Sequence, residues 1–136
     1  MNATPKASAV VFAKHAAKLA RFYREVAGME EIHADKSHVV LDGSHFQLVI
    51  HNIPKKIADT IGITDPPHIR ASNPLKICLP VPSIENARTL AAALGGKVGA
   101  KKKEWQARGF TACDGHDPEG NVFQVRESAE QPGNCP

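Results

Sequence analysis

The segments HFQLVI (His45–Ile50) and VFQVRE (Val122–Glu127) decide the fold of this 136-residue chain. Each is a short run of β-strand composition in which phenylalanine, glutamine and an aliphatic residue follow one another. The two phenylalanines lie 77 positions apart, as do the two glutamines, Gln47 and Gln124. Two similar strands at matching places in two halves indicate a duplicated module.

The first half predicts a strand, a helix and three further strands. The expected elements are a strand at 7–13, a helix at 15–27, and strands near 29–34, 38–41 and 45–51. The helix carries an apolar stripe, and Gly28 follows it where a C-capping glycine belongs. Asp42-Gly43 marks a hairpin turn between the last two strands.

The second half repeats that order. The expected elements are a strand at 75–81, a helix that begins after the N-cap Ser83 and ends at Gly95-Gly96, and strands near 97–100, 109–113 and 121–127. With an offset of 68 residues, Ser8 falls on Lys76 and His15 on Ser83. The second half is nine residues longer between its glycine and its final strand, and we place the surplus in the loop KKKEWQARG, which contains Trp105.

Residues 53–73 separate the halves and contain several prolines, with a short helical piece expected at 55–61. We therefore predict a single domain with module 1 at about 7–52, a linker at 53–73, module 2 at about 74–127 and a tail at 128–136. A linker of this length is often functional, so we expect it to help cover a pocket.

Composition excludes several classes of protein. The chain is 42% hydrophobic and 23% charged with a net charge of +3, which is typical of a globular domain and too weakly basic to indicate nucleic-acid binding. No apolar run has the length of a membrane span, and we interpret the N-terminus as a first strand, not a signal peptide. The three cysteines, Cys78, Cys113 and Cys135, have no CxxC spacing, which predicts free thiols in a reducing cytoplasm.

The tandem βαβββ order, with FYREVAGM (22–29) closing the first helix and GHDPEGNVFQV (115–125) near the end, resembles the vicinal oxygen chelate superfamily. That group includes glyoxalase I, extradiol dioxygenases, and bleomycin- and fosfomycin-resistance proteins. The resemblance extends from about Ala7 to Glu127, and the DPEGN turn (117–121) is its most specific part. It implies an α+β fold in which two tandem βαβββ modules form a curved, half-barrel mixed sheet with helices outside. It also implies a homodimer.

Metal-dependent members of the superfamily take their ligands, typically His, Glu or Gln, from four equivalent inward positions, two in each module. Strand alternation places Gln47 and Gln124 on the concave side, and the resemblance assigns the other two positions to Ser8 and Lys76. This set has no carboxylate and no imidazole, and an ammonium group repels a divalent ion. We therefore expect no metal and no cofactor at these positions.

The function expected from this set is metal-independent binding of a small anionic or oxygen-rich molecule in the concave cavity, as in a glyoxalase-like or bleomycin-resistance-like protein. Lys76 and Arg126 would supply positive charge, and Trp105 would stack on the ligand. The candidate ligand-binding residues are Ser8, Gln47, His51, Lys76, Gln124, Arg126 and Trp105.

Two alternatives stay open. In the first alternative, the chain is an enzyme of the same superfamily, namely a lyase, isomerase or dioxygenase. Such an enzyme would use an unrecognised metal site or acid–base chemistry of Lys76 or His51. The other alternative is an interaction module with a filled cavity. The seven histidines show no HxH or HExxH spacing, and His51 is the best single metal candidate because it shares a face with Gln47.

Overall fold

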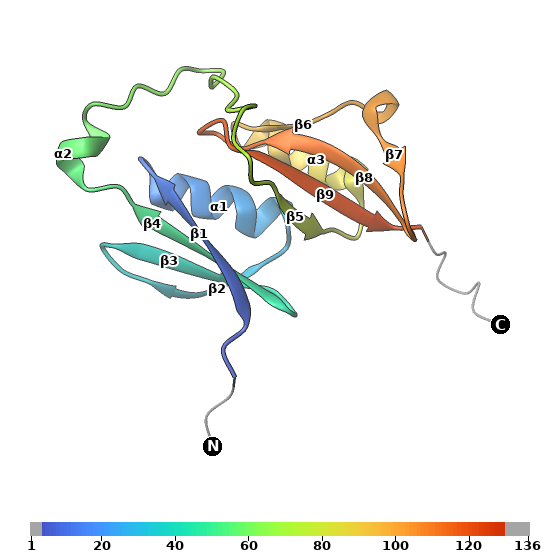
Figure 1. The fold of residues 1–136 in the computed structure, drawn as a ribbon, viewed down its shortest axis with the longest axis horizontal. Helices are drawn as coiled ribbons and strands as arrows, with labels where there is room; N and C mark the ends of the chain where they lie inside the picture. Colours follow the sequence, from blue (N-terminus) through green and yellow to red (C-terminus); the bar gives the residue numbers. More distant parts are fainter. Residues whose placement is uncertain (1–3, 130–136) are drawn as a thin grey trace. The chain divides into compact units, whose positions relative to one another are not determined.

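Two βαβββ units account for residues 4–129, which are the residues that the computed structural model describes (Figure 1). The chain divides into Met1–Gly62, called unit 1, and Ile63–Pro136, called unit 2. The division falls inside the predicted linker. The predicted α+β class with two tandem modules is confirmed.

Unit 1 forms a mixed four-stranded sheet in the order β1-β4-β3-β2. Its elements are β1 (Ala7–Ala13), α1 (Ala16–Val26), β2 (Glu30–Ala34), β3 (His38–Asp42), β4 (Phe46–Asn52) and α2 (Lys55–Ala58). β1 runs parallel to β4, whereas β2, β3 and β4 pair antiparallel. The crossover through α1 is what allows two parallel strands to lie side by side.

The core of unit 1 lies between α1 and one face of the sheet. The apolar stripe of α1 and the alternate residues of β3 and β4 are buried there: Leu19, Phe22, Tyr23, Val26, Leu41, Leu48 and Ile50. Strand alternation puts Val10 and Phe12 of β1 on the opposite face, where they are 52% and 59% exposed. The helix ends before Gly28, whose φ of 64° confirms the predicted capping glycine.

Unit 2 repeats the arrangement with a sheet in the order β5-β9-β8-β6 and a short strand, β7, that also pairs with β8. Its elements are β5 (Ile77–Pro80), α3 (Ile84–Ala93), β6 (Lys97–Val98), a 3₁₀ turn η1 (Lys101–Lys103), β7 (Trp105–Gln106), β8 (Phe110–His116) and β9 (Val122–Ser128). β5 runs parallel to β9. The Ser83 hydroxyl accepts a hydrogen bond of 3.1 Å from the Asn86 backbone N–H, which confirms the predicted cap of α3.

The DPEGN turn sets the register of the last hairpin. Asp117 is fully buried, and its Oδ1 accepts from the backbone N–H groups of Glu119 and Asn121 at 2.9 and 3.0 Å. Gly120 has φ of 88°, and its carbonyl oxygen accepts from the Arg70 backbone N–H at 2.9 Å. The bonds to Asp117 close the turn between β8 and β9, whose register pairs Gln124 with Asp114. The bond from Arg70 ties the linker to this turn.

Three predictions about unit 2 need correction. The 68-residue offset that equates Ser8 with Lys76 is wrong for the strands, because the parallel registers pair Ser8 with Gln47 and Cys78 with Gln124. The offset holds at the helix caps, and the connection from β5 to α3 is shorter than the one from β1 to α1. β7 was not predicted. β8 continues to His116, past the predicted end at Cys113, because pairing with β9 overrides the weak strand propensity of Asp-Gly-His.

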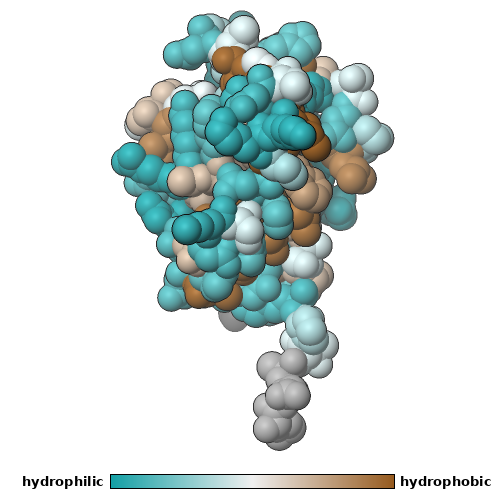
Figure 2. All heavy atoms as spheres, turned by 90° about the vertical axis from the view of Figure 1, so that its left-hand side faces the viewer, coloured by the Kyte–Doolittle hydropathy of each residue, from teal (hydrophilic) through white to brown (hydrophobic). Residues whose placement is uncertain are grey.

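Among residues 4–129, no helix is both long and apolar enough to cross a membrane. Figure 2 shows that hydrophilic residues cover most of the face it presents and that hydrophobic residues appear as separate patches. Separate patches of this kind are ordinary for a protein surface.

Candidate functional site

The open face of each sheet, meaning the face opposite its helix, carries the candidate residues. In unit 1 the parallel register pairs Ser8 with Gln47 and Phe12 with His51, and the antiparallel register pairs Asp42 with Gln47. In unit 2 the corresponding strands place Cys78 and Asp114 on either side of Gln124. Residues that pair across strands share a face of the sheet.

In unit 1 a lysine, an aspartate and a glutamine form a connected group. Gln47 Nε2 donates to Asp42 Oδ1 at 2.9 Å, and Lys6 Nζ donates to both carboxylate oxygens of Asp42 at 2.9 and 3.0 Å. The bond from Lys6, followed by the bond from Gln47, lowers the pKa of Asp42 below its ordinary value. Asp42 is therefore a carboxylate whose charge is already balanced.

Unit 2 repeats the same group with different sequence numbers. Lys76 Nζ donates to Asp114 Oδ2 at 2.9 Å, and Gln124 Nε2 donates to Asp114 Oδ1 at 3.1 Å. Lys6 stands two residues before Ser8, as Lys76 stands two residues before Cys78. We call these two groups the Lys–Asp–Gln triads. They are related by strand register, which the 68-residue offset had obscured.

The triads do not suit a divalent ion. Each has a carboxylate that offers a metal ligand, a donor absent from the predicted set, but a lysine ammonium group lies within 3 Å of it in both units. A divalent cation beside Asp42 or Asp114 would meet the positive charge of Lys6 or Lys76. No imidazole from residues 4–129 is among the other potential metal ligands of the triads. These ligands are the glutamine amide oxygens and the side chains of Ser8 and Cys78.

Arg126 lies on the open face of unit 2, one alternation beyond Gln124 on β9. Its Nε donates to Gln124 Oε1 at 2.7 Å, and its guanidinium lies 4.5 Å from the centre of the Phe110 ring. Arg108 approaches the same ring at 5.3 Å. Among residues 4–129, no group bonds to the two terminal nitrogens of Arg126, so these donors remain available to a ligand.

Trp105 reaches the same face through β7. It pairs with Ala112, which pairs with Arg126, so Trp105 and Arg126 lie in one row across three strands. Arg88 of α3 fixes the preceding segment, because it donates to Gly99 O at 2.7 Å and to Glu104 Oε2 at 2.6 Å. Trp105 itself is 42% exposed. The loop predicted around it is therefore an anchored turn and strand.

His51 lies at the other end of the unit 1 sheet. Its ring stands 5.7 Å from Phe12 and 5.8 Å from His38, nearly parallel to the latter at 8°. Next to it is a cavity of about 540 Å³ in unit 1. Besides His51, it is lined by Lys14, Lys36 and Lys55 from three different segments. Asp59 also lines the cavity and pairs with Lys55 at 2.8 Å, so Lys55 adds no net positive charge to it.

The structure groups the predicted residues into two sets, each within one unit. Ser8, Gln47 and His51 share the open face of unit 1, and Lys76, Gln124, Arg126 and Trp105 share that of unit 2.

Sequence reasoning missed Lys6, Asp42 and Asp114. Asp42 was interpreted only as a turn residue, although its place across the hairpin from Gln47 indicates a partner. Lys6 was discoverable too, because it shares the alternation of Ser8.

Comparison with known proteins agrees with this geometry. The family model described as "Glyoxalase-like domain" matches residues 8–126. No curated protein matches significantly.

Solved structures give the same fold. A glyoxalase/bleomycin resistance protein/dioxygenase family enzyme from Burkholderia phytofirmans PsJN is 17% identical with a TM-score of 0.64, over 90% of this chain and 97% of that one. A bleomycin resistance determinant encoded on the transposon Tn5 is 15% identical with a TM-score of 0.59, over 93% and 100%. A fosfomycin resistance protein from Listeria monocytogenes is 14% identical with a TM-score of 0.61, over 97% and 96%.

At these identities the structural matches show the fold alone. The family model covers most of the chain, including both triad glutamines. The chain therefore belongs to the glyoxalase-like domain family.

Proposed function

We propose that this protein binds a small oxyanion or oxygen-rich molecule on the open faces of its sheets, without a metal at the Lys–Asp–Gln triads. The observation that carries the proposal is the state of Arg126. Its Nε bond to Gln124 and its contact with Phe110 hold the guanidinium in place, while its terminal nitrogens bond to no described residue. A guanidinium held in this way presents two parallel donors that match a carboxylate or phosphate.

Neighbouring side chains support the same ligand class. Lys76 adds a second cation in unit 2, although Asp114 balances its charge, and Trp105 and Phe110 offer flat apolar surfaces. A ligand with one anionic group and a planar or apolar body would use both kinds of contact.

The cavity of unit 1 provides a second place for the same ligand class. Its volume of about 540 Å³ suits a small molecule, and it is lined by Lys14, Lys36, His51 and the ion pair between Lys55 and Asp59. Variants in the two units separate these locations, because Arg126 lies in unit 2 and Lys36 in unit 1.

The superfamily enzymes suggest the rival function, a lyase, isomerase or dioxygenase. For Lys76 to act as a base, its ion pair with Asp114 would have to break. A turnover screen on hemithioacetals, catechols and epimerisable thioesters tests this alternative, and activity that disappears in Lys76→Ala would support it.

Trp105 is the only tryptophan, so its fluorescence reports on the Arg126 face. We expect saturable changes in its emission on titration with at least one of acetate, oxalate, phosphate, methylphosphonate and sulfate in the presence of a chelator. Arg126→Ala should weaken that binding at least about tenfold, because hydrogen bonds to charged groups contribute about 1.5–3 kcal/mol.

Arg21→Ala is the matched control. It removes the same charge from the exposed surface of α1, where Arg21 pairs with Glu25. If Arg126→Ala and Arg21→Ala weaken oxyanion binding equally, the loss of net charge explains the effect, and the site at Arg126 is refuted. Isothermal titration calorimetry detects binding in either unit. Weaker binding of Lys36→Ala in that measurement, with Arg126→Ala unchanged, would instead place the ligand in the cavity of unit 1.

We also propose a homodimer. Val10 and Phe12 support this, since both are exposed apolar residues on β1, an edge strand of its sheet. Sedimentation velocity at two protein concentrations tests it, and a monomer at both concentrations would count against it.

A further inference from the structure

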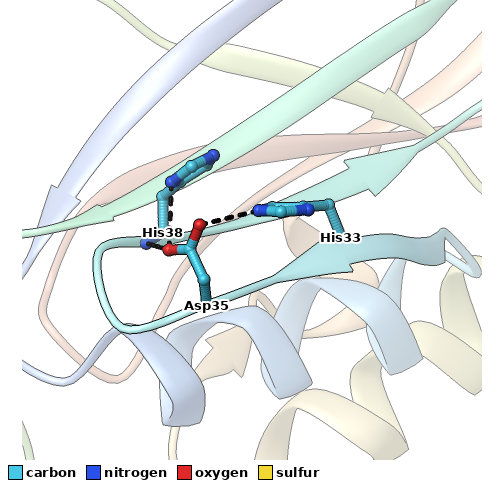
Figure 3. Close-up of side chains that lie close together, drawn as sticks. All are labelled: His33, Asp35 and His38. Atoms are coloured by element: carbon cyan, nitrogen blue, oxygen red, sulfur yellow. Dashed lines mark hydrogen bonds and ion pairs between the residues drawn. The ribbon is translucent and has the colours of Figure 1, made fainter.

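The β2–β3 hairpin of unit 1 brings together two histidines and a carboxylate (Figure 3). His33 comes from β2, Asp35 from the turn and His38 from the start of β3. The antiparallel pairing and the 3.0 Å bond from Asp35 N to His38 O close the hairpin around them. One potential ligand atom from each residue lies within 4.8 Å of the others.

The distances are close to those of a metal site. His33 Nε2 lies 2.8 Å from Asp35 Oδ2, and His38 Nδ1 lies 3.4 Å from Asp35 Oδ1. Imidazole nitrogens and carboxylate oxygens bind Zn²⁺ at about 2.0–2.2 Å, so neighbouring ligands of one ion stand roughly 3 Å apart. An ion could therefore replace the proton between His33 and Asp35 with little movement of either side chain.

Other contacts hold this arrangement before any ion binds. Asp35 Oδ1 accepts from Ser37 N at 2.7 Å, Ser37 Oγ at 2.8 Å and His38 N at 3.0 Å, and Asp35 Oδ2 lies next to His33. Ser37 Oγ also lies 2.7 Å from His38 Nδ1, so an ion bound at this nitrogen would replace that hydrogen bond. The His38 ring stacks on the ring of His51 in β4. The centre of the His33 ring lies 4.9 Å from the centre of the His38 ring.

We propose that His33, Asp35 and His38 form a surface binding site for a divalent transition-metal ion such as Zn²⁺, Ni²⁺ or Cu²⁺. Two imidazoles and one carboxylate favour these ions over Mg²⁺ or Ca²⁺, which prefer oxygen ligands. The side chains of His33 and Asp35 are 49% and 45% exposed, so water would occupy the remaining coordination positions. The site shares no residue with either triad or with Arg126.

Titration of the intact protein with Zn²⁺ against a chromophoric chelator tests the proposal. We expect one ion per chain, with His33→Ala and His38→Ala each weakening binding at least about tenfold, in line with the cost of losing support for a bound metal. Asp35→Asn should weaken it as well. This variant keeps an oxygen for the turn and removes the second carboxylate oxygen, and circular dichroism would verify that each variant folds.

His45→Ala is the matched control, because His45 is an exposed histidine of the same unit outside the hairpin. The His45→Ala variant should bind Zn²⁺ with the same affinity as the parent protein. Three results would overturn the proposal. The first is that the parent protein binds no Zn²⁺. The others are that the His33→Ala and His38→Ala variants both keep the parent affinity, or that His45→Ala weakens binding as much as they do.

Discussion

At the scale of single residues, Gln47 and Gln124 are each held by a hydrogen bond to an aspartate on the adjacent strand. Each amide nitrogen donates to an aspartate, and a lysine donates to the same aspartate. In each unit the three side chains thus balance one another's charge and hydrogen-bonding capacity. The ammonium group takes the place next to the carboxylate that a metal ion would need.

The ion pair between Lys6 and Asp42 should make the free energy of unfolding depend on pH in the acid range. The pKa of Asp42 is depressed in the folded state from its ordinary 3.8, chiefly by the bond from Lys6, so the folded state favours the charged form. The resulting stabilisation is complete above the pKa of the unfolded chain and is lost as pH falls through the folded pKa. Lys6→Ala should therefore reduce the loss of stability between pH 7 and about pH 3, measured as the shift in urea midpoint.

Lys18→Ala is the control for that experiment, because Lys18 is an exposed lysine on α1. An equal change in acid sensitivity in both variants would mean that overall charge, and not the ion pair, is responsible.

The two described cysteines should differ in reactivity. Cys113 is fully buried and burial raises the pKa of its thiol, whereas Cys78 is partly accessible. Alkylation requires the thiolate. Iodoacetamide labelling followed by peptide mass spectrometry should modify Cys78 first and Cys113 only after denaturation. Equal labelling of both in the native protein would contradict the buried position of Cys113. Cys135, the third predicted free thiol, lies outside the described residues.

At the scale of elements, the turn before β9 imposes the strictest requirement for glycine. A Cβ on Gly120 would lie 2.0 Å from His68 O, and its φ is 88°; a Cβ on Gly28, with φ of 64°, would meet no atom within 4 Å. Gly28→Ala should cost about 1–2 kcal/mol for the left-handed conformation alone. Gly120→Ala should cost roughly 1–3 kcal/mol more, because backbone must move. Urea unfolding of the two variants measures the difference, and equal destabilisation would contradict it.

Sequence patterns predicted these elements well wherever the pattern is local. The apolar stripe and Gly28 located α1, and Ser83 located the start of α3. Strand pairing depends on connection lengths instead, so the 68-residue offset identified the helix caps and failed for β5. β7 contains only two residues and exists because β8 offers it a partner, which no periodicity reveals.

The candidate site was predictable only in part for the same reason. Alternation along β4 and β9 placed Gln47, Gln124 and Arg126 on the open faces. The carboxylates that engage the glutamines come from neighbouring strands, and the histidine cluster requires the fold of the β2–β3 hairpin. Contacts between strands depend on register, and register is set by turns as well as by the pattern of each strand.

At the scale of the whole molecule, two units built on one plan repeat the Lys–Asp–Gln triad and differ in the rest of their open faces. Unit 1 adds Val10, Phe12 and a row of histidines, and unit 2 adds Arg126, Phe110 and Trp105. Membership of the glyoxalase-like family thus fixes the scaffold, and we expect the side chains on the two open faces to decide which ligands the chain binds.

The most direct test of the central claim, ligand binding that needs no metal at the triads, is the affinity of one oxyanion measured by Trp105 fluorescence under two conditions. The protein carries His33→Ala and His38→Ala, so that the hairpin cannot bind an ion, and is measured once with a chelator and once with added Zn²⁺. We expect the same affinity under both conditions. Binding that disappears in the chelator and returns with Zn²⁺ would contradict it.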